Sequence, residues 1–208
     1  MYTHSKETQT KLTPELAFQL LKDGNERFMN NLRANRNLLQ QVNETANGQF
    51  PFAAILSCMD SRTSAELVFD QGLGDIFSIR VAGNVLNDDI LGSLEYATKA
   101  AGAKIIVVLG HSKCGAIAGA CNDVKLGHLT GLLEKIQPAI EAEKDTKENR
   151  NGSNAAYVGH VTELNVHLTM AQITEQSPVI AELVNEGKVI VAGGVYDVET
   201  GEVTFFKK

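Results

Sequence analysis

Short apolar runs, each ending in polar or glycine residues, are the clearest pattern along the chain. β-branched runs of this kind are typical of strands that are buried on both faces, as in a parallel sheet. Two later runs flank Glu199-Thr200-Gly201, which predicts a hairpin. The expected strands are 53–57, about 75–81, 104–109 and 188–192, with hairpin arms at 195–198 and 202–206. The sequence therefore predicts an α/β fold with a mostly parallel four-stranded central sheet, a C-terminal antiparallel strand and helices on both faces.

Helical periodicity fills the segments before and between these strands. Leucines recur at helical spacing between positions 12 and 21, around a Thr13-Pro14 pair that suits a helix start. Gly24 is expected to end this helix, and a second helical piece is expected at 25–32. Beyond it we expect a solvated loop at 141–154, a helix at 155–175, and another helix from Ser177-Pro178 to Gly187.

The N-terminal helices have too little core of their own to fold alone. We therefore predict one domain, 1–208, in which 1–48 form a helical arm and 49–208 the α/β core. From this pattern alone, the arm is expected to pack on its own domain.

Two polar stretches begin where strands are expected to end, at Cys58-Met59-Asp60-Ser61-Arg62 and at His111-Ser112-Lys113-Cys114. In open α/β sheets, sites gather at the carboxyl ends of the strands, so neighbouring strands would bring Cys58 and His111 to one edge. Two thiols and an imidazole are the ligand set of a tetrahedral zinc site with one position open, which is the catalytic arrangement. Inert buried cysteines, or a thiol nucleophile with its base, are the alternatives. The second of these leaves Asp60 and Arg62 without a role.

Composition narrows the class of protein. The chain has 208 residues, a formal net charge of −6 and a pI near 5.4, which argues against a nucleic-acid binder. No apolar run is long enough to span a membrane, and residues 1–7 lack the apolar region of a signal peptide. Three cysteines, of which two are assigned to the site, suit a reducing compartment. We therefore expect a cytoplasmic enzyme with no nucleic-acid or membrane partner.

The pattern Cys-x-Asp-Ser-Arg followed by Gly-His-x-x-Cys-Gly resembles that of the β-class carbonic anhydrases, from about Gln49 to the C-terminus. The resemblance implies one Zn²⁺ per chain, with Cys58, His111 and Cys114 as its ligands. It also implies that Asp60 and Arg62 form a catalytic dyad, and that Asp60 is a fourth zinc ligand in an alternative, inactive state.

The resemblance is to the non-allosteric kind of this class, which has a glutamine at the position of Gln49 and lacks a particular tryptophan. This chain has Ile55 at that place and no tryptophan at all. The resemblance implies a homodimer or homotetramer in which the pocket combines residues of different subunits, with Gln49 on one side and Phe77 and Tyr96 on the other. The substrate-binding residues that it implies are Gln49, Phe77, Ala82, Tyr96 and Gly115.

The expected activity is the reversible hydration of CO₂ to bicarbonate and a proton by zinc-bound hydroxide. Asp60 would accept the hydroxide proton in a hydrogen bond, and Arg62 would hold Asp60 ionised and away from the metal. Two alternatives are a hydrolase of CS₂ or COS with the same site, and a non-catalytic zinc-binding assembly protein. The second should have lost Asp60 or Arg62, and this chain has both.

Several other residues are assigned smaller roles. Thr63 stands where the family usually has valine and is expected to matter little. Cys121 is expected to be a small core residue. The remaining histidines are candidates for proton relay, although surface or core roles are commoner; they are His4, His128, His160 and His167.

Overall fold

The computed structural model describes residues 3–206 and shows one five-stranded sheet in the order β2-β1-β3-β4-β5. The expectation about a leader rests partly on residues 1–2, which lie outside this range. The strands are β1 (Ala53–Ser57), β2 (Ile76–Arg80), β3 (Ile105–His111), β4 (Ile190–Tyr196) and β5 (Val203–Phe205). The first four strands pair in parallel, and β5 pairs antiparallel with β4. The predicted fold class is confirmed.

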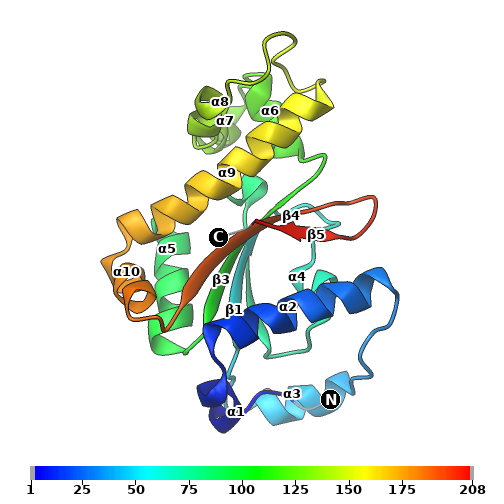
Figure 1. The fold of residues 1–208 in the computed structure, drawn as a ribbon, viewed down its shortest axis with the longest axis vertical. Coiled ribbons are helices and arrows are strands. Elements are labelled where there is room, and N and C mark those ends of the chain that lie inside the picture. Colours follow the sequence, from blue (N-terminus) through cyan, green and yellow to red (C-terminus); the bar gives the residue numbers. More distant parts are fainter. Residues whose placement is uncertain (1–2, 207–208) are drawn as a thin grey trace.

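Helices cover both faces of this sheet (Figure 1). Residues that alternate along β1 and β3 face α2 and α4 on one side, and α5, α9 and α10 on the other. The helices are α1 (Lys6–Lys11), α2 (Pro14–Met29), α3 (Leu38–Thr45), α4 (Ala65–Val68), α5 (Asp88–Glu95), α6 (Gly115–Cys121), α7 (Gly127–Glu134), α8 (Gln137–Ala142), α9 (Ala155–Gln176) and α10 (Pro178–Asn185). A short turn, η1 (Ala82–Asn84), follows β2, and a π-helical turn, η2 (Tyr96–Ala100), continues α5.

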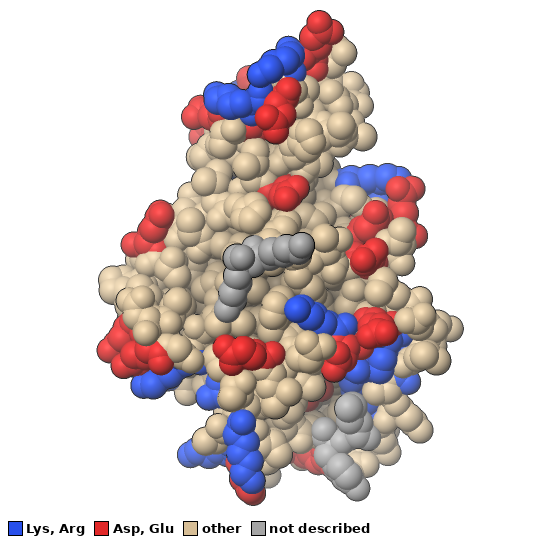
Figure 2. All heavy atoms as spheres, viewed as in Figure 1, with Lys and Arg blue, Asp and Glu red and all other residues tan. Residues whose placement is uncertain are grey.

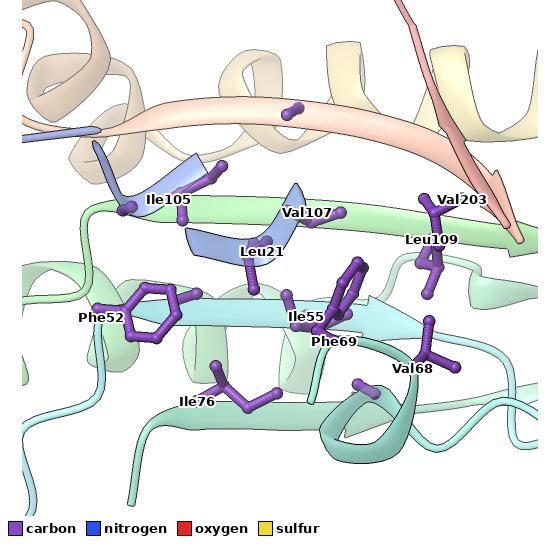
Figure 3. Packing of buried hydrophobic residues seen from close by; sticks show 14 of the residues in the cluster. Leu21, Phe52, Ile55, Val68, Phe69, Ile76, Ile105, Val107, Leu109 and Val203 are labelled. Atoms are coloured by element: carbon purple, nitrogen blue, oxygen red, sulfur yellow. The ribbon is translucent and has the colours of Figure 1, made fainter. Parts of the chain in front are cut away.

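The sheet is held by apolar packing on both of its faces. Figure 3 shows Ile55 of β1 and Val107 of β3 gathered with Leu21 of α2 and with Phe69, which follows α4. All residues of β1 and β3 are buried, as expected for central strands of a parallel sheet. Burial of one such side chain contributes about 1.5–3 kcal/mol, so this core fixes where the two strands end.

Helix α2 runs through Gly24 to Met29, so the predicted break at Gly24 is wrong. Glycine is needed at position 24 because the helix backbone passes close to the Phe69 peptide, and an added Cβ would lie 1.8 Å from the carbonyl oxygen of Phe69. Helices α1 and α3 were not predicted from the sequence. In α1, the buried Gln9 side chain donates to the carbonyl of Pro51 at 2.7 Å, so this part of the arm packs on its own chain.

The runs at 188–192 and 195–198 belong largely to one strand, β4, rather than to two elements. The glycines between these runs let the neighbouring strand lie close to β4, because a Cβ at Gly194 would lie 2.8 Å from the carbonyl oxygen of Thr204 in β5. The predicted loop at 141–154 is confirmed except at its start, which is the end of α8. The predicted helices at 155–175 and 178–187 correspond to α9 and α10.

The surface carries charges of both signs. On the face in Figure 2, Lys and Arg side chains are interspersed with Asp and Glu, and the described residues there form no continuous basic stripe. Within residues 3–206, no helix combines the length and the apolar character needed to cross a bilayer.

Candidate metal centre

Three potential metal ligands meet at the carboxyl edge of the sheet. Cys58 directly follows β1, His111 ends β3, and Cys114 is the N-cap of α6. Because β1 and β3 are parallel neighbours, their ends meet at one edge, as the sequence predicted. The ligand atoms of the three residues all lie within 4.8 Å of one another, and the residues are buried.

The geometry of this cluster fits a tetrahedral metal ion. The two Sγ atoms are 4.0 Å apart, and tetrahedral Zn–S bonds of about 2.3 Å would place them about 3.8 Å apart. The Nδ1 atom of His111 lies 2.9 Å from the carbonyl oxygen of Ser112, so Nδ1 carries the proton and Nε2 the lone pair. That Nε2 is buried and has no hydrogen-bond partner within residues 3–206. A buried ring nitrogen left in this way is costly, and a metal ion would satisfy it.

The two thiols differ in acidity. The two Sγ atoms are close enough to share one hydrogen, and this sharing lowers the pKa of Cys58 and raises the pKa of Cys114. The backbone N–H of Gly83 also donates to the Cys58 sulfur, at 3.4 Å. One thiolate is therefore already favoured by the fold, and a cation would favour the second.

Asp60 and Arg62 form a bidentate pair beside the cluster. Nε and Nη2 of Arg62 donate to the two carboxylate oxygens of Asp60 at 2.9 and 2.7 Å, and the backbone N–H of Arg62 donates at 2.9 Å. These bonds hold the pKa of the Asp60 carboxyl well below its usual range. Its Oδ2 atom lies 4.0 Å from Nε2 of His111. The Asp60 carboxylate is thus held by Arg62 next to the three potential metal ligands, at a partly exposed position.

Arg80 and Thr63 both bind the loop that follows β1. Arg80 was not predicted from the sequence, and Thr63 was expected to matter little. Arg80 donates from Nη2 to the carbonyl oxygen of Asp60 at 2.5 Å and from Nε to that of Cys58 at 3.2 Å. Thr63 is buried, and its hydroxyl donates to the same two carbonyls at 2.9 and 3.0 Å. Valine could not make those bonds. Arg80 is a polar residue at the end of a predicted strand, and this was the signal that could have found it.

The structure does not bring the five expected substrate-binding residues together. Gly115 follows Cys114 directly, and Ala82 lies in η1 beside Gly83. Phe77 and Tyr96 instead line a separate groove of about 550 Å³, with their rings 6.1 Å apart. None of the potential metal ligands lines that groove. Gln49 is exposed in the segment before β1.

The other histidines lie outside the metal cluster, which is the only group of its kind within residues 3–206. His160 lies 3.4 Å from the carboxylate of Glu143, and His167 stacks on Phe206 at 4.1 Å. His4 packs edge-on against Phe52, and His128 is exposed on α7. Cys121, predicted to be a core residue, is half-buried and packs against the margin of the apolar cluster under α6.

Comparison with known proteins decides the family. The sequence model of the carbonic anhydrase family matches residues 53–203. The chain belongs to the β-class carbonic anhydrases. It is 36% identical over 196 residues to carbonic anhydrase 2 of Mycobacterium tuberculosis, covering 90% of each chain. The prediction of a carbonic anhydrase enzyme is confirmed, whereas the non-allosteric kind stays a prediction.

Solved structures agree with the fold. A β-carbonic anhydrase of Aspergillus fumigatus superposes with a TM-score of 0.71 at 27% identity, covering 81% of each chain. One of two tetrameric β-carbonic anhydrases from Sordaria macrospora gives a TM-score of 0.69 at 24% identity, covering 81% of this chain and 90% of that one.

Proposed function

We propose that this β-class carbonic anhydrase hydrates CO₂ reversibly to bicarbonate and a proton, with one zinc ion per chain held by Cys58, His111 and Cys114. The observation that carries the proposal is the buried, unpartnered Nε2 of His111, grouped with two thiols and 4.0 Å from the Asp60 carboxylate. Zinc in such a site lowers the pKa of water and so supplies a hydroxide nucleophile near neutral pH.

Asp60 orients the nucleophile in this proposal. Its carboxylate, which Arg62 keeps ionised, would accept a hydrogen bond from the nucleophile that the metal supplies and would so orient that oxygen toward the carbon of CO₂. Addition of hydroxide to CO₂ would give bicarbonate, and the proton lost from the activated water would leave to buffer. Arg62 keeps Asp60 at this place, because both carboxylate oxygens are bound by its planar guanidinium.

The intact dyad favours an enzyme over a non-catalytic zinc-binding protein, which has no need of an ionised carboxylate beside its metal. The experiment is a stopped-flow CO₂ hydration assay on purified protein, with zinc quantified and with COS and CS₂ tested in parallel. We expect about one zinc per chain and CO₂ as the preferred substrate. Zinc-loaded protein that hydrolyses only the sulfur compounds, or no substrate, would contradict the proposal.

We also propose a homodimer or homotetramer in which Phe77 and Tyr96 complete the pocket of a second subunit. None of the chain's own potential metal ligands lines their groove, which supports this, as does the tetrameric state of the Sordaria protein. Exposed apolar residues of α3 offer a surface for such contacts; they are Leu38, Leu39 and Val42.

A single domain and a cytoplasmic location complete the proposal. Ala17 and Leu21 of the arm are fully buried in the core below the sheet, which supports one domain, 1–208, formed by arm 1–48 and core 49–208. The cysteines at 58, 114 and 121 are free thiols, which suits a reducing compartment.

A further inference from the structure

We propose that the turn of the C-terminal hairpin, residues 197–201, holds the metal ligand His111 in place, and that Ser112 and Asp197 are the positioning residues that connect them. This rests on the proposed zinc site and specifies how the chain orients one of its ligands. Ser112 and Asp197 lie far apart in the sequence, and no local motif connects them.

The first step is the bond between His111 and Ser112. The Nδ1–H of His111 donates to the carbonyl oxygen of Ser112 at 2.9 Å. This bond fixes both the tautomer and the rotation of the ring, so the place of the Ser112 peptide decides where Nε2 points. Within residues 3–206, Nδ1 of His111 has no carboxylate partner of the kind that often supports a metal-bound histidine, and the peptide that follows His111 holds the ring instead.

The second step is the way in which Ser112 is held. Its backbone N–H donates to the carbonyl of Tyr196 at 2.9 Å. Its hydroxyl oxygen accepts from the backbone N–H of Val198 at 3.0 Å and lies 3.5 Å from Oδ1 of Asp197. The backbone N–H and the hydroxyl of Ser112 are therefore both bonded to the hairpin, while its carbonyl oxygen holds His111.

The turn itself is braced. Oδ1 of Asp197 accepts from the backbone N–H of Glu199 at 2.7 Å, which fixes the first half of the turn. The buried side chain of Asn25, on α2, donates to the carbonyl of Gly201 at 2.9 Å and accepts from the N–H of Val203 at 2.9 Å. A continuous set of hydrogen bonds therefore runs from the arm through the turn to the metal ligand.

Neighbouring contacts show why Ser112 needs this support. Lys113 has φ of 56°, a left-handed conformation that is strained for a residue with a side chain. Its Nζ pairs with Glu199 at 2.7 Å, but both side chains are more than half exposed, so this ion pair contributes little. The part-buried hydrogen bond between the Val198 N–H and the Ser112 hydroxyl is shielded from solvent better than this ion pair, and it connects the strained loop to the turn.

The test measures zinc affinity by competition with a chromophoric chelator. Ser112→Ala should still bind one zinc at saturation but weaken affinity by about 10- to 100-fold, as changes to a ligand's supporting residue commonly do. Ser112→Thr keeps a hydroxyl and should restore most of the affinity. Asp197→Ala should weaken affinity, whereas Asp197→Asn keeps the Oδ1 acceptor and should not. Ser153→Ala, which removes an exposed hydroxyl bonded only within its own loop, is the matched control.

A second readout separates orientation from general stability. In cobalt-substituted protein, Ser112→Ala should change the ligand-field bands while keeping the thiolate charge-transfer band, because only the imidazole moves. Zinc affinity and cobalt spectra like those of wild type in both Ser112→Ala and Asp197→Ala would overturn the inference and leave the zinc site standing. Wild-type protein that takes up no zinc would overturn the proposed function, and the inference with it.

Discussion

The candidate metal centre and the groove lined by Phe77 and Tyr96 differ in one respect: a single chain supplies the potential ligands of the first, whereas the second is open and contains none of them. At the metal centre, three potential ligands and an ion-paired carboxylate converge within one subunit. The groove lies beside the edge strand β2 and is lined by none of the ligands, and Tyr96 is 59% exposed.

The difference follows from the position of each region in the sheet. Cys58 follows β1 and His111 ends β3. These two interior strands pair with each other and are buried on both faces, so packing within the chain places both residues. Phe77 lies on β2, which pairs on one side only. An edge strand leaves its outer side open to another molecule. The chain therefore assembles the potential metal ligands by itself, and in our proposal a second copy supplies the other wall of the pocket.

The largest effect should come from the ligands themselves. Cys114→Ser or Cys58→Ser should lose zinc and activity together, because a hydroxyl does not replace a thiolate as a zinc ligand. Metal content by atomic absorption and CO₂ hydration on the same samples check this. Cys121→Ser is the matched control and should be nearly silent. Full zinc retention by Cys114→Ser would remove Cys114 from the site.

Arg62→Lys should keep zinc but lose most activity. Lysine is a point charge and cannot bind both oxygens of Asp60, so the carboxylate is freed to approach the metal. Losses for positioned acid–base groups are commonly ~10²–10⁴-fold, and we expect a loss in that range. Turnover per bound zinc is the measurement. A variant with wild-type turnover would show that the bidentate pair is not required.

Tyr96→Ala tests the other side of the comparison. It should retain full zinc and lose up to roughly tenfold in activity, because an aromatic pair such as Phe77–Tyr96 contributes about 0.5–1.5 kcal/mol. Light scattering at assay concentration should show that the active species is at least a dimer. A fully active monomer would contradict the proposed sharing of the pocket.

Glu143→Gln should leave both regions unchanged and affect only stability. Burial of this carboxyl would raise its pKa, but the backbone N–H of Thr146 and the Arg150 guanidinium outweigh burial and lower the pKa to about 2. Because the folded pKa is depressed, the stabilisation is present above the ordinary value of 4.5 and is lost as the pH falls towards 2. Wild type should melt above the variant at pH 7, and thermal melts should converge as the pH falls through that window. A difference in melting temperature between wild type and variant that stays constant with pH would show that the ionised Glu143 carboxylate is not the source of the stabilisation.

How far the sequence predicts the structure depends on the range of the interactions. The sheet and the approach of Cys58 to His111 were predictable, because each ligand follows a strongly apolar run and parallel neighbours end at one edge. The continuity of α2 through Gly24 was not, since the reason for that glycine is the carbonyl of Phe69.

Contacts between distant segments account for the remaining differences. Helix α1 is short and polar, so the sequence has no periodic apolar pattern that would predict it. The helix is held instead by the buried Gln9, which donates a hydrogen bond to the carbonyl of the distant Pro51. The link from Ser112 to the hairpin joins residues that no local motif connects. The separation of Phe77 and Tyr96 from the metal ligands likewise depends on strand order, which the apolar pattern does not give.

The most direct test of the central claim is CO₂ hydration by Asp60→Asn across neutral to alkaline pH, with zinc quantified in every sample. The three ligands remain, so zinc content should equal that of wild type. The group that orients hydroxide is gone, so turnover per zinc should fall by ~10²–10⁴-fold at every pH. Wild-type turnover by the zinc-loaded variant throughout this range would show that the dyad is structural, and would contradict the proposed mechanism.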